Sequence, residues 1–191
     1  MIRRLADGGL DVAKEELIEL VRAHIRALRS PAPRAPVTLA VVGSRQLNGA
    51  EDCRMVGDVL LGVCGGGDVA TIVSGGAEGP DTHAARFVWL APHEQALTLA
   101  EHRPDFPEAG WSKDYIRAYR EAAMARNNLI VDACHALLFF QMLNKDGRGS
   151  AGTQDDVDKA EKQRKAAFGL CVYRSGTGSA NECCVCSRSS W

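Results

Sequence analysis

Between residues 37 and 173 the chain alternates short apolar segments with longer segments of helical periodicity. Apolar runs without a polar face predict strands buried on both sides, and helices between them predict right-handed crossovers. The predicted strands are residues 37–42, 69–73, 96–100, 135–141 and 168–173. The predicted helices are residues 51–63, 80–90, 113–132 and 153–167. This alternation predicts an α/β, Rossmann-like doubly wound parallel sheet of about five strands, with helices on both faces.

The most economical strand order for such a sheet is 3-2-1-4-5. The winding then reverses between the first and fourth strands, and open α/β sheets bind their ligands at this reversal, beyond the carboxyl ends of the strands. Glycine-containing segments at residues 43–45, 74–81 and 149–153 lie near such strand ends and precede helices. They are typical of loops that bring backbone amides to a phosphate, so we expect a nucleotide-type ligand.

Composition and charge limit the classes of function that this chain can have. The chain has 191 residues, of which 46% are hydrophobic, and a formal net charge of -1. This charge creates no overall field that would attract nucleic acid or anionic lipid. No apolar run approaches the ~18 to 20 residues needed to cross a bilayer, and the start of the chain lacks the apolar core of a signal peptide. The number of cysteines is odd, and their spacing is not that of a disulfide framework, which predicts a reducing, cytoplasmic setting.

We expect one nucleotide-binding domain, residues 37–173, with two appendages. Residues 1–36 contain an amphipathic helix over 10–28, packed on the domain or on a partner, followed by a proline-rich linker. Residues 174–191, rich in Ser, Gly and Cys, read as a flexible tail. Cys183, Cys184 and Cys186 crowd this tail without a nearby fourth ligand, so we predict no metal site, and no separate cofactor is expected.

The loop after the first predicted strand offers Gly43, Ser44 and Arg45. Gly43 permits a sharp turn at the strand end. The Arg45 guanidinium can form paired hydrogen bonds with a phosphate or a carboxylate, which makes it and Ser44 candidate ligand-binding residues.

The loop after the second predicted strand is the most specific segment. Glycines remove the β-carbons that would hold a ligand away from backbone amides, and Pro80 suits the first turn of a helix. Asp81 lies in that first turn, where it either offsets the helix dipole or accepts hydrogen bonds from ribose hydroxyls. The candidate ligand-binding residues of this segment are Ser74, Gly75, Gly76, Ala77, Gly79 and Asp81.

The third loop begins the last predicted helix. Ser150 or Thr153 can cap this helix, and its free amides again predict an anion site. The candidate binding residues here are Gly149, Ser150, Gly152 and Thr153. Asp155 and Asp156 follow in the first turn, where acidic residues are common at any helix start. On composition alone, Arg126 and Asn127 would be a solvated helix end.

Taken in order, these motifs resemble the SLOG superfamily of nucleotide-binding Rossmann-like domains, and its YspA-like members most of all. The resemblance covers residues 37 to 173, and it implies a nucleotide-derived ligand at the carboxyl edge of the sheet. It also adds Arg126 and Asn127 to the ligand-binding residues. A homo-oligomer is expected by analogy with this superfamily.

Two alternatives follow from the same resemblance. Lonely Guy members cleave nucleoside monophosphates into base and ribose 5-phosphate, which here would make Arg126 and Asp155 or Asp156 catalytic. Their Pro-Gly-Gly-x-Gly-Thr-x-x-Glu segment overlays residues 148–156, where this chain has Arg148, Ser150 and Asp156 in place of Pro, Gly and Glu. DprA members bind single-stranded DNA, but no basic-aromatic stripe favours that function here. We therefore expect a protein that binds or senses a nucleotide-derived small molecule, with nucleic acid as the less favoured partner.

Overall fold

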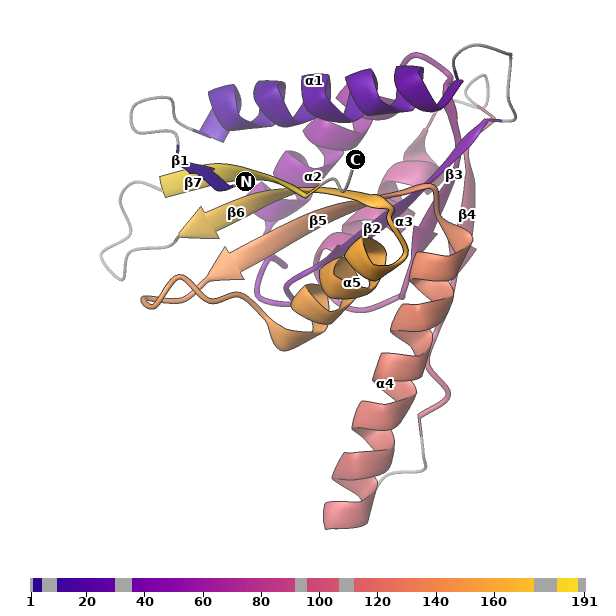
Figure 1. Cartoon of the computed structure of the whole chain (residues 1–191), viewed down its shortest axis with the longest axis vertical. Helices are drawn as coiled ribbons and strands as arrows, with labels where there is room; N and C mark the ends of the chain where they lie inside the picture. The colour runs from indigo at the N-terminus through magenta and orange to yellow at the C-terminus, as the bar shows by residue number, and fades with distance from the viewer. Residues whose placement is uncertain are drawn as a thin grey trace.

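The described residues form one seven-stranded sheet with helices on both faces (Figure 1). The computed structural model describes residues 2–4, 10–29, 36–91, 96–106, 112–173 and 182–188. The strands are β1 (Ile2–Arg4), β2 (Val37–Gly43), β3 (Val69–Ser74), β4 (Thr98–Glu101), β5 (Ala136–Leu143), β6 (Ala166–Tyr173) and β7 (Glu182–Arg188). The helices are α1 (Leu10–Arg29), α2 (Ala50–Cys64), α3 (Pro80–Leu90), α4 (Lys113–Ala133) and α5 (Ala151–Lys162).

The strand order is β1-β7-β6-β5-β2-β3-β4, and every pairing from β4 across to β6 is parallel. The five strands predicted from the sequence therefore occur in the predicted order, 3-2-1-4-5. The continuous apolar runs explain this, since the central strands are buried on both faces. The Rossmann-like α/β fold class is confirmed.

Two strands lie outside that prediction. β7 pairs antiparallel with β6, and β1 pairs antiparallel with β7. The prediction of a flexible tail is wrong for residues 182–188, because these residues complete the sheet edge beside β6. The remaining tail residues and the proline-rich linker at 30–35 lie outside the described residues.

The last helix is shorter than predicted. It was expected to reach residue 167, but α5 ends at Lys162 and β6 begins at Ala166. Arg164 has a positive φ of 56°, and the Lys165 amide donates to the carbonyl of Ala160. A residue in the left-handed conformation, followed by an amide that donates back to the last helical turn, is a common C-terminal helix cap. Glycine usually occupies the left-handed position, and here arginine does.

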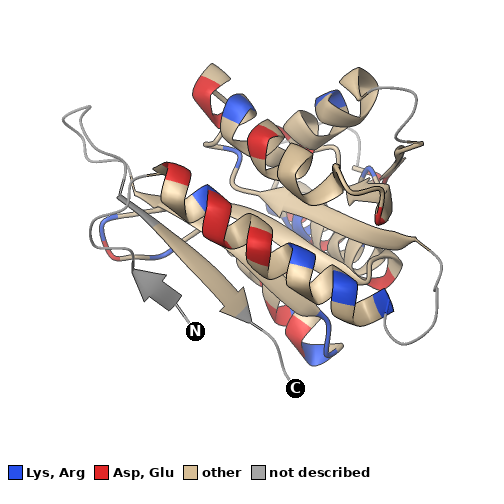
Figure 2. Cartoon of the chain, turned by 90° about the horizontal axis from the view of Figure 1, so that it is seen from above, with Lys and Arg blue, Asp and Glu red and all other residues tan. Residues whose placement is uncertain are grey.

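The core has two halves, one on each face of the sheet. α1, α2 and α3 pack on one face, and α4 and α5 pack on the other. α1 inserts a stripe with four-residue spacing into the first half, formed by Ala13, Leu17, Val21 and Ile25. Its outer face is charged, with acidic side chains gathered in the first half and basic ones in the second (Figure 2), which complements the helix dipole.

α4 differs from the other helices in its exposure. Its N-terminal half extends beyond the edge of the sheet (Figure 1), where Ile116 is 42% exposed. Only Asn127, Ile130 and Val131, toward its C-terminal end, are buried. No helix in the described part of the chain has both the length and the apolar character that a membrane span requires.

If α1 is an integral part of this core, Leu17→Ala should lower the free energy of unfolding by about 2 to 5 kcal/mol, because it leaves a cavity under a fully buried side chain. Urea denaturation monitored by circular dichroism measures this change. The control is Leu20→Ala on the same helix, where the side chain is 36% exposed and the loss should stay below about 1 kcal/mol. Equal effects of the two substitutions would show that α1 does not pack as described.

Candidate functional site

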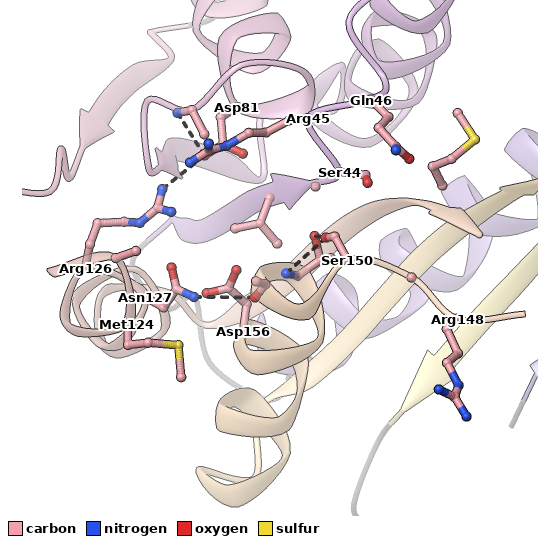
Figure 3. A pocket seen from close by; sticks show the side chains of 18 of the residues that line it. Ser44, Arg45, Gln46, Asp81, Met124, Arg126, Asn127, Arg148, Ser150 and Asp156 are labelled. Atoms are coloured by element: carbon pink, nitrogen blue, oxygen red, sulfur yellow. Dashed lines mark hydrogen bonds and ion pairs between the residues drawn. The ribbon is translucent and has the colours of Figure 1, made fainter. Parts of the chain in front are cut away.

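A cavity of about 480 Å³ opens where the winding of the sheet reverses. β2 and β5 are neighbours there, and their last paired residues are Gly43 and Phe140. Figure 3 shows side chains from the β2–α2 loop, α3, α4 and α5 around this cavity. Twelve residues predicted from the sequence line it: Gly43, Ser44, Arg45, Ala77, Asp81, Arg126, Asn127, Gly149, Ser150, Gly152, Thr153 and Asp156.

The first loop turns sharply and sends Arg45 to the cavity rim. Ser44 is buried, and its amide donates to the Phe140 carbonyl at 2.9 Å. Gly43 is required by packing, because a β-carbon there would meet the Phe140 carbonyl oxygen and the ring of Pro80. The exposed Arg45 side chain donates from Nη2 to the Tyr119 hydroxyl at 3.4 Å. Tyr119 in turn stacks on Phe106, with ring centroids 4.0 Å apart, which gives Arg45 a fixed neighbour on α4.

The second loop is organised around Asp81. This carboxylate is buried, and its Oδ1 accepts from the Gly75 amide at 2.9 Å and from the Ala77 amide at 3.5 Å. The amides that were expected to hold a phosphate therefore already have an acceptor within the protein. The Gly76 amide donates to the Ser74 hydroxyl at 3.4 Å. Only Ala77 and Asp81 of this loop line the cavity.

The backbone conformation and the packing of this loop require glycine at several positions. The sequence alone does not distinguish this requirement from contact with a ligand. Gly76 and Gly79 have positive φ angles of 65° and 87°. A β-carbon at Gly75 would overlap the guanidinium of Arg126. Gly75 therefore makes room for an arginine of the same chain.

Arg126 and Asn127 both face the cavity from α4 (Figure 3). Arg126 Nη1 lies 3.6 Å from Asp81 Oδ1, and the Arg126 side chain is only 12% exposed. The Asn127 Nδ2 donates to Asp155 Oδ2 at 2.9 Å and to the Gly152 carbonyl at 3.4 Å. This pair is thus a buried element of the site and not the solvated helix end that composition suggested.

The third loop caps α5 as predicted. The Ser150 hydroxyl accepts from the Thr153 amide at 3.4 Å, and the two hydroxyl oxygens lie 2.7 Å apart. Gly149 leaves the space that the Gln141 side chain fills. Gly152 is exposed at the cavity wall, so no residue in the described part of the chain covers the start of this helix at that point.

The two aspartates of α5 have different surroundings. Asp155 forms an ion pair with Lys159 at 2.7 Å, accepts from Asn127, and is not part of the cavity wall. Asp156 is only 4% exposed and lines the cavity. One residue along a helix turns the side chain by ~100°, which is why adjacent aspartates separate in this way.

Arg126 shares its charge between two buried carboxyl groups. Burial raises the pKa of Asp81 to about 6, although Arg126 and the Gly75 and Ala77 amides act to lower it. The pKa of Asp156 is raised to about 8, mainly by burial; Arg126 acts to lower it, and the negative charges of Asp81 and Asp155 act to raise it. At neutral pH, Asp81 is therefore mainly ionised and paired with Arg126, whereas Asp156 is mainly protonated.

Three buried polar atoms of this cluster have no hydrogen-bond partner among the residues that the structure describes: Arg126 Nε, Asn127 Oδ1 and Asp156 Oδ1. A buried polar group without a partner costs about 1 to 3 kcal/mol, so native proteins keep few of them. All three belong to residues that line one cavity. This concentration indicates a place where a ligand or ordered water completes the network.

Sequence reasoning missed several residues of the cavity wall: Val42, Gln46, Ala123, Met124, Met142, Asn144 and Arg148. Asn144 had a local signal, because its side chain accepts from the amides of Asp146 and Arg148 and closes a polar turn. Arg148 reaches away from the cluster around Asp81 and Asp156 (Figure 3). Met124 had no distinguishing signal, because it is one of several apolar residues along α4.

Comparison with known proteins returned little. No protein-family model matches the chain, and no curated protein sequence matches it. Among solved structures, the chain is similar to DNA processing protein A from Helicobacter pylori, a protein described for its single-stranded DNA binding mode. The identity is 19%, the match covers 76% of this chain and 69% of that one, and the TM-score is 0.47.

The raised pKa of Asp156 predicts a pH-dependent stability. The native state holds this proton more tightly than the unfolded chain, so stability should fall as the pH rises from about 4 toward 8. Asp156→Asn imitates the protonated form and should raise the free energy of unfolding at pH 8 by roughly 1 kcal/mol or more, with a smaller gain at pH 5 and little change near pH 3. Thermal unfolding across this pH range measures the effect.

Asp155→Asn is the matched control for that substitution. It removes an ion pair with Lys159 and an acceptor for Asn127, so it should not stabilise the protein at pH 8. Stabilisation by both substitutions, or by neither, would contradict the assignment of the buried proton to Asp156.

Proposed function

We propose that the cavity at the reversal of the sheet binds a phosphorylated, nucleotide-type small molecule. The observation that carries this proposal is the gathering of three unpartnered buried polar atoms around it, on Arg126, Asn127 and Asp156. A ligand with both donors and acceptors would complete these hydrogen bonds. The volume of about 480 Å³ lies in the range of small-molecule sites.

The phosphate is assigned to the side of the cavity formed by Arg45 and the start of α5. The first amides of a helix have no intrahelical acceptor and carry a partial positive charge. Gly152 brings these amides to the cavity wall without a covering side chain, and the exposed Arg45 adds a guanidinium from the opposite loop. These two features supply the charge and the donors that a phosphate group needs.

The ribose is assigned to Asn127 and Asp156, which differs from the expectation from sequence that Asp81 would hold it. Asp81 Oδ1 already serves two amides and Arg126. Within the described residues, Asn127 Oδ1 and Asp156 Oδ1 are buried acceptors of this cavity without partners. In this assignment Asp81 positions Arg126 and does not contact the ligand.

The motifs also support membership in the SLOG superfamily as part of the proposal. The candidate binding residues of the first and third loops, together with Arg126 and Asn127, all line the cavity. The homo-oligomer expected by analogy stays a prediction.

Calorimetric titration with AMP tests the binding proposal. The native protein should bind AMP, and Arg126→Ala should weaken binding by at least about tenfold, because a charge-assisted contact contributes about 1.5 to 3 kcal/mol. Arg120→Ala, on the same helix but outside this cavity, should leave binding unchanged. Arg45→Ala at the exposed rim serves as a second variant in case Arg126→Ala disturbs folding.

Failure of AMP, ribose 5-phosphate and NAD to bind the native protein would overturn the small-molecule proposal. So would tight binding of a labelled oligonucleotide with a steep salt dependence in the absence of nucleotide binding, because that result indicates phosphate-backbone recognition.

Asp156 favours a second function, hydrolysis of the N-glycosidic bond. A carboxyl group that is protonated near neutral pH can donate its proton to the departing base while water forms the new bond to C1′. The water's proton then returns to the carboxylate, so the group is regenerated. Arg126 would hold the phosphorylated sugar during this exchange.

If this activity exists, AMP incubated with the protein should yield adenine and ribose 5-phosphate in equal amounts, measured by chromatography. Asp156→Asn should reduce the rate at least about 100-fold, the low end of general acid–base contributions, and Asp155→Asn should retain most of it. Binding of AMP without product at any pH from 6 to 9 would assign the protein to ligand sensing.

A further inference from the structure

Three buried cysteines meet on the face of the sheet that α5 covers. Cys171 lies on β6, and Cys184 and Cys186 lie on β7. Their sulfur atoms all lie within 4.8 Å of one another, and Cys171 Sγ is 3.2 Å from Cys186 Sγ. Each of the three residues is no more than 5% exposed. The cluster thus connects β6, a strand of the core, with β7, which lies in the segment predicted from the sequence to be a flexible tail.

The antiparallel register of β6 and β7 produces this cluster. Cys171 is the direct partner of Cys184, and residues two apart on one strand share a face, so Cys186 lies on that face as well. Cys186 is paired with Gly169, where a β-carbon would overlap the ring of Phe139. The Phe139 ring thus fills the space that a side chain at residue 169 would take opposite Cys186.

The cluster also borders a cavity of its own, of about 410 Å³. Besides the three cysteines, Gln154 and Tyr173 contribute polar side chains to its wall, and Arg148 contributes a guanidinium. This cavity is separate from the proposed nucleotide site, although Arg148 and Gly149 border both. Small molecules or water therefore have space next to the sulfur atoms.

We propose that Cys171, Cys184 and Cys186 bind one Zn²⁺ ion as thiolates, with the fourth coordination position open to the adjacent cavity. Thiolates are preferred ligands of zinc, and three protein ligands with one open position form a known type of zinc site. Among the residues whose side chains the structure describes, no fourth His, Cys, Asp or Glu joins the group. Water from the cavity fills the fourth position in this proposal.

Charge favours a divalent ion over a monovalent one. Three thiolates carry three negative charges in a buried site, and Zn²⁺ leaves only one of them uncompensated. Binding converts three thiols and one Zn²⁺ into one zinc–thiolate complex and three released protons. The neighbouring sulfur atoms and burial raise the pKa of Cys171. Zinc affinity should therefore rise with pH, because the protons must leave before the metal binds.

The test uses the full chain, reduced and freed of metal, with Zn²⁺ and Co²⁺ as probes. Native mass spectrometry should show one Zn²⁺ per chain, and Co²⁺ should give the intense near-ultraviolet absorption of thiolate-to-cobalt charge transfer. Competition with a chromophoric chelator measures affinity. Cys171→Ser should weaken Zn²⁺ binding by more than the ~100-fold that loss of an outer-shell partner can cause.

Cys134→Ser is the control, because Cys134 is a buried cysteine of the same hydrophobic cluster but its thiol donates to the Val131 carbonyl instead. It should leave zinc affinity unchanged. Cys186→Ala is the second variant, and proton release by the native chain, three per Zn²⁺, provides a reading that needs no variant.

The proposal would be overturned by absence of a one-to-one zinc complex, or by a Co²⁺ spectrum without thiolate absorption. Equal weakening by Cys134→Ser would also contradict it. A disulfide between Cys171 and Cys186 in the air-exposed protein, found by peptide mapping together with no zinc uptake after reduction, would identify the cluster as a redox pair instead.

Discussion

The buried guanidinium of Arg126, which pairs with Asp81 and acts electrostatically on Asp156, is the interaction on which the rest of the site depends. Asp81 is held by two backbone amides of its own loop and lies 3.6 Å from Arg126 Nη1. Asp156 keeps its proton to about pH 8 mainly because it is buried; Arg126 acts against this, and the negative charge of Asp81 supports it. A pocket with one compensated ion pair and one neutral acid can accept an anionic ligand without strong repulsion.

The fold explains why these groups meet. Asp81 lies in the first turn of α3, Arg126 lies in the C-terminal half of α4 and Asp156 lies in the first half of α5, so they are far apart in the sequence. The reversal between β2 and β5 brings the three helices around one strand edge. Two glycines then permit the contact distances, since Gly43 admits the start of α3 and Gly75 admits the Arg126 guanidinium. The absence of a side chain at these two glycines serves packing as much as ligand access.

The sequence was sufficient for the five parallel strands, their order and the place of the cavity, because buried parallel strands and glycine loops leave strong signals in the sequence. It was insufficient for the direction of single side chains. It did not separate Asp155 from Asp156, and it did not reveal that Asp81 turns back onto the amides of Gly75 and Ala77. These outcomes depend on helix phase and on one short loop, which composition does not encode.

The pairing of β7 with β6 was the second feature that the sequence did not predict. The β7 segment has little hydrophobic periodicity, and only its alignment with Cys171 and Gly169 on β6 makes it part of the sheet. The three-cysteine cluster follows from that register and from nothing local in the sequence. In the same way, α5 stops at Lys162 through a left-handed arginine, although glycine or asparagine is the usual signal.

Carbon-13 NMR titration of the Asp156 carboxyl group tests the central claim most directly. It measures the protonation state of Asp156, which depends on its burial and on the charges of Arg126, Asp81 and Asp155. We predict a pKa of about 8 in the ligand-free protein. An ordinary aspartate pKa near 4 would show that Asp156 is solvated or fully paired, and would contradict this account of the site.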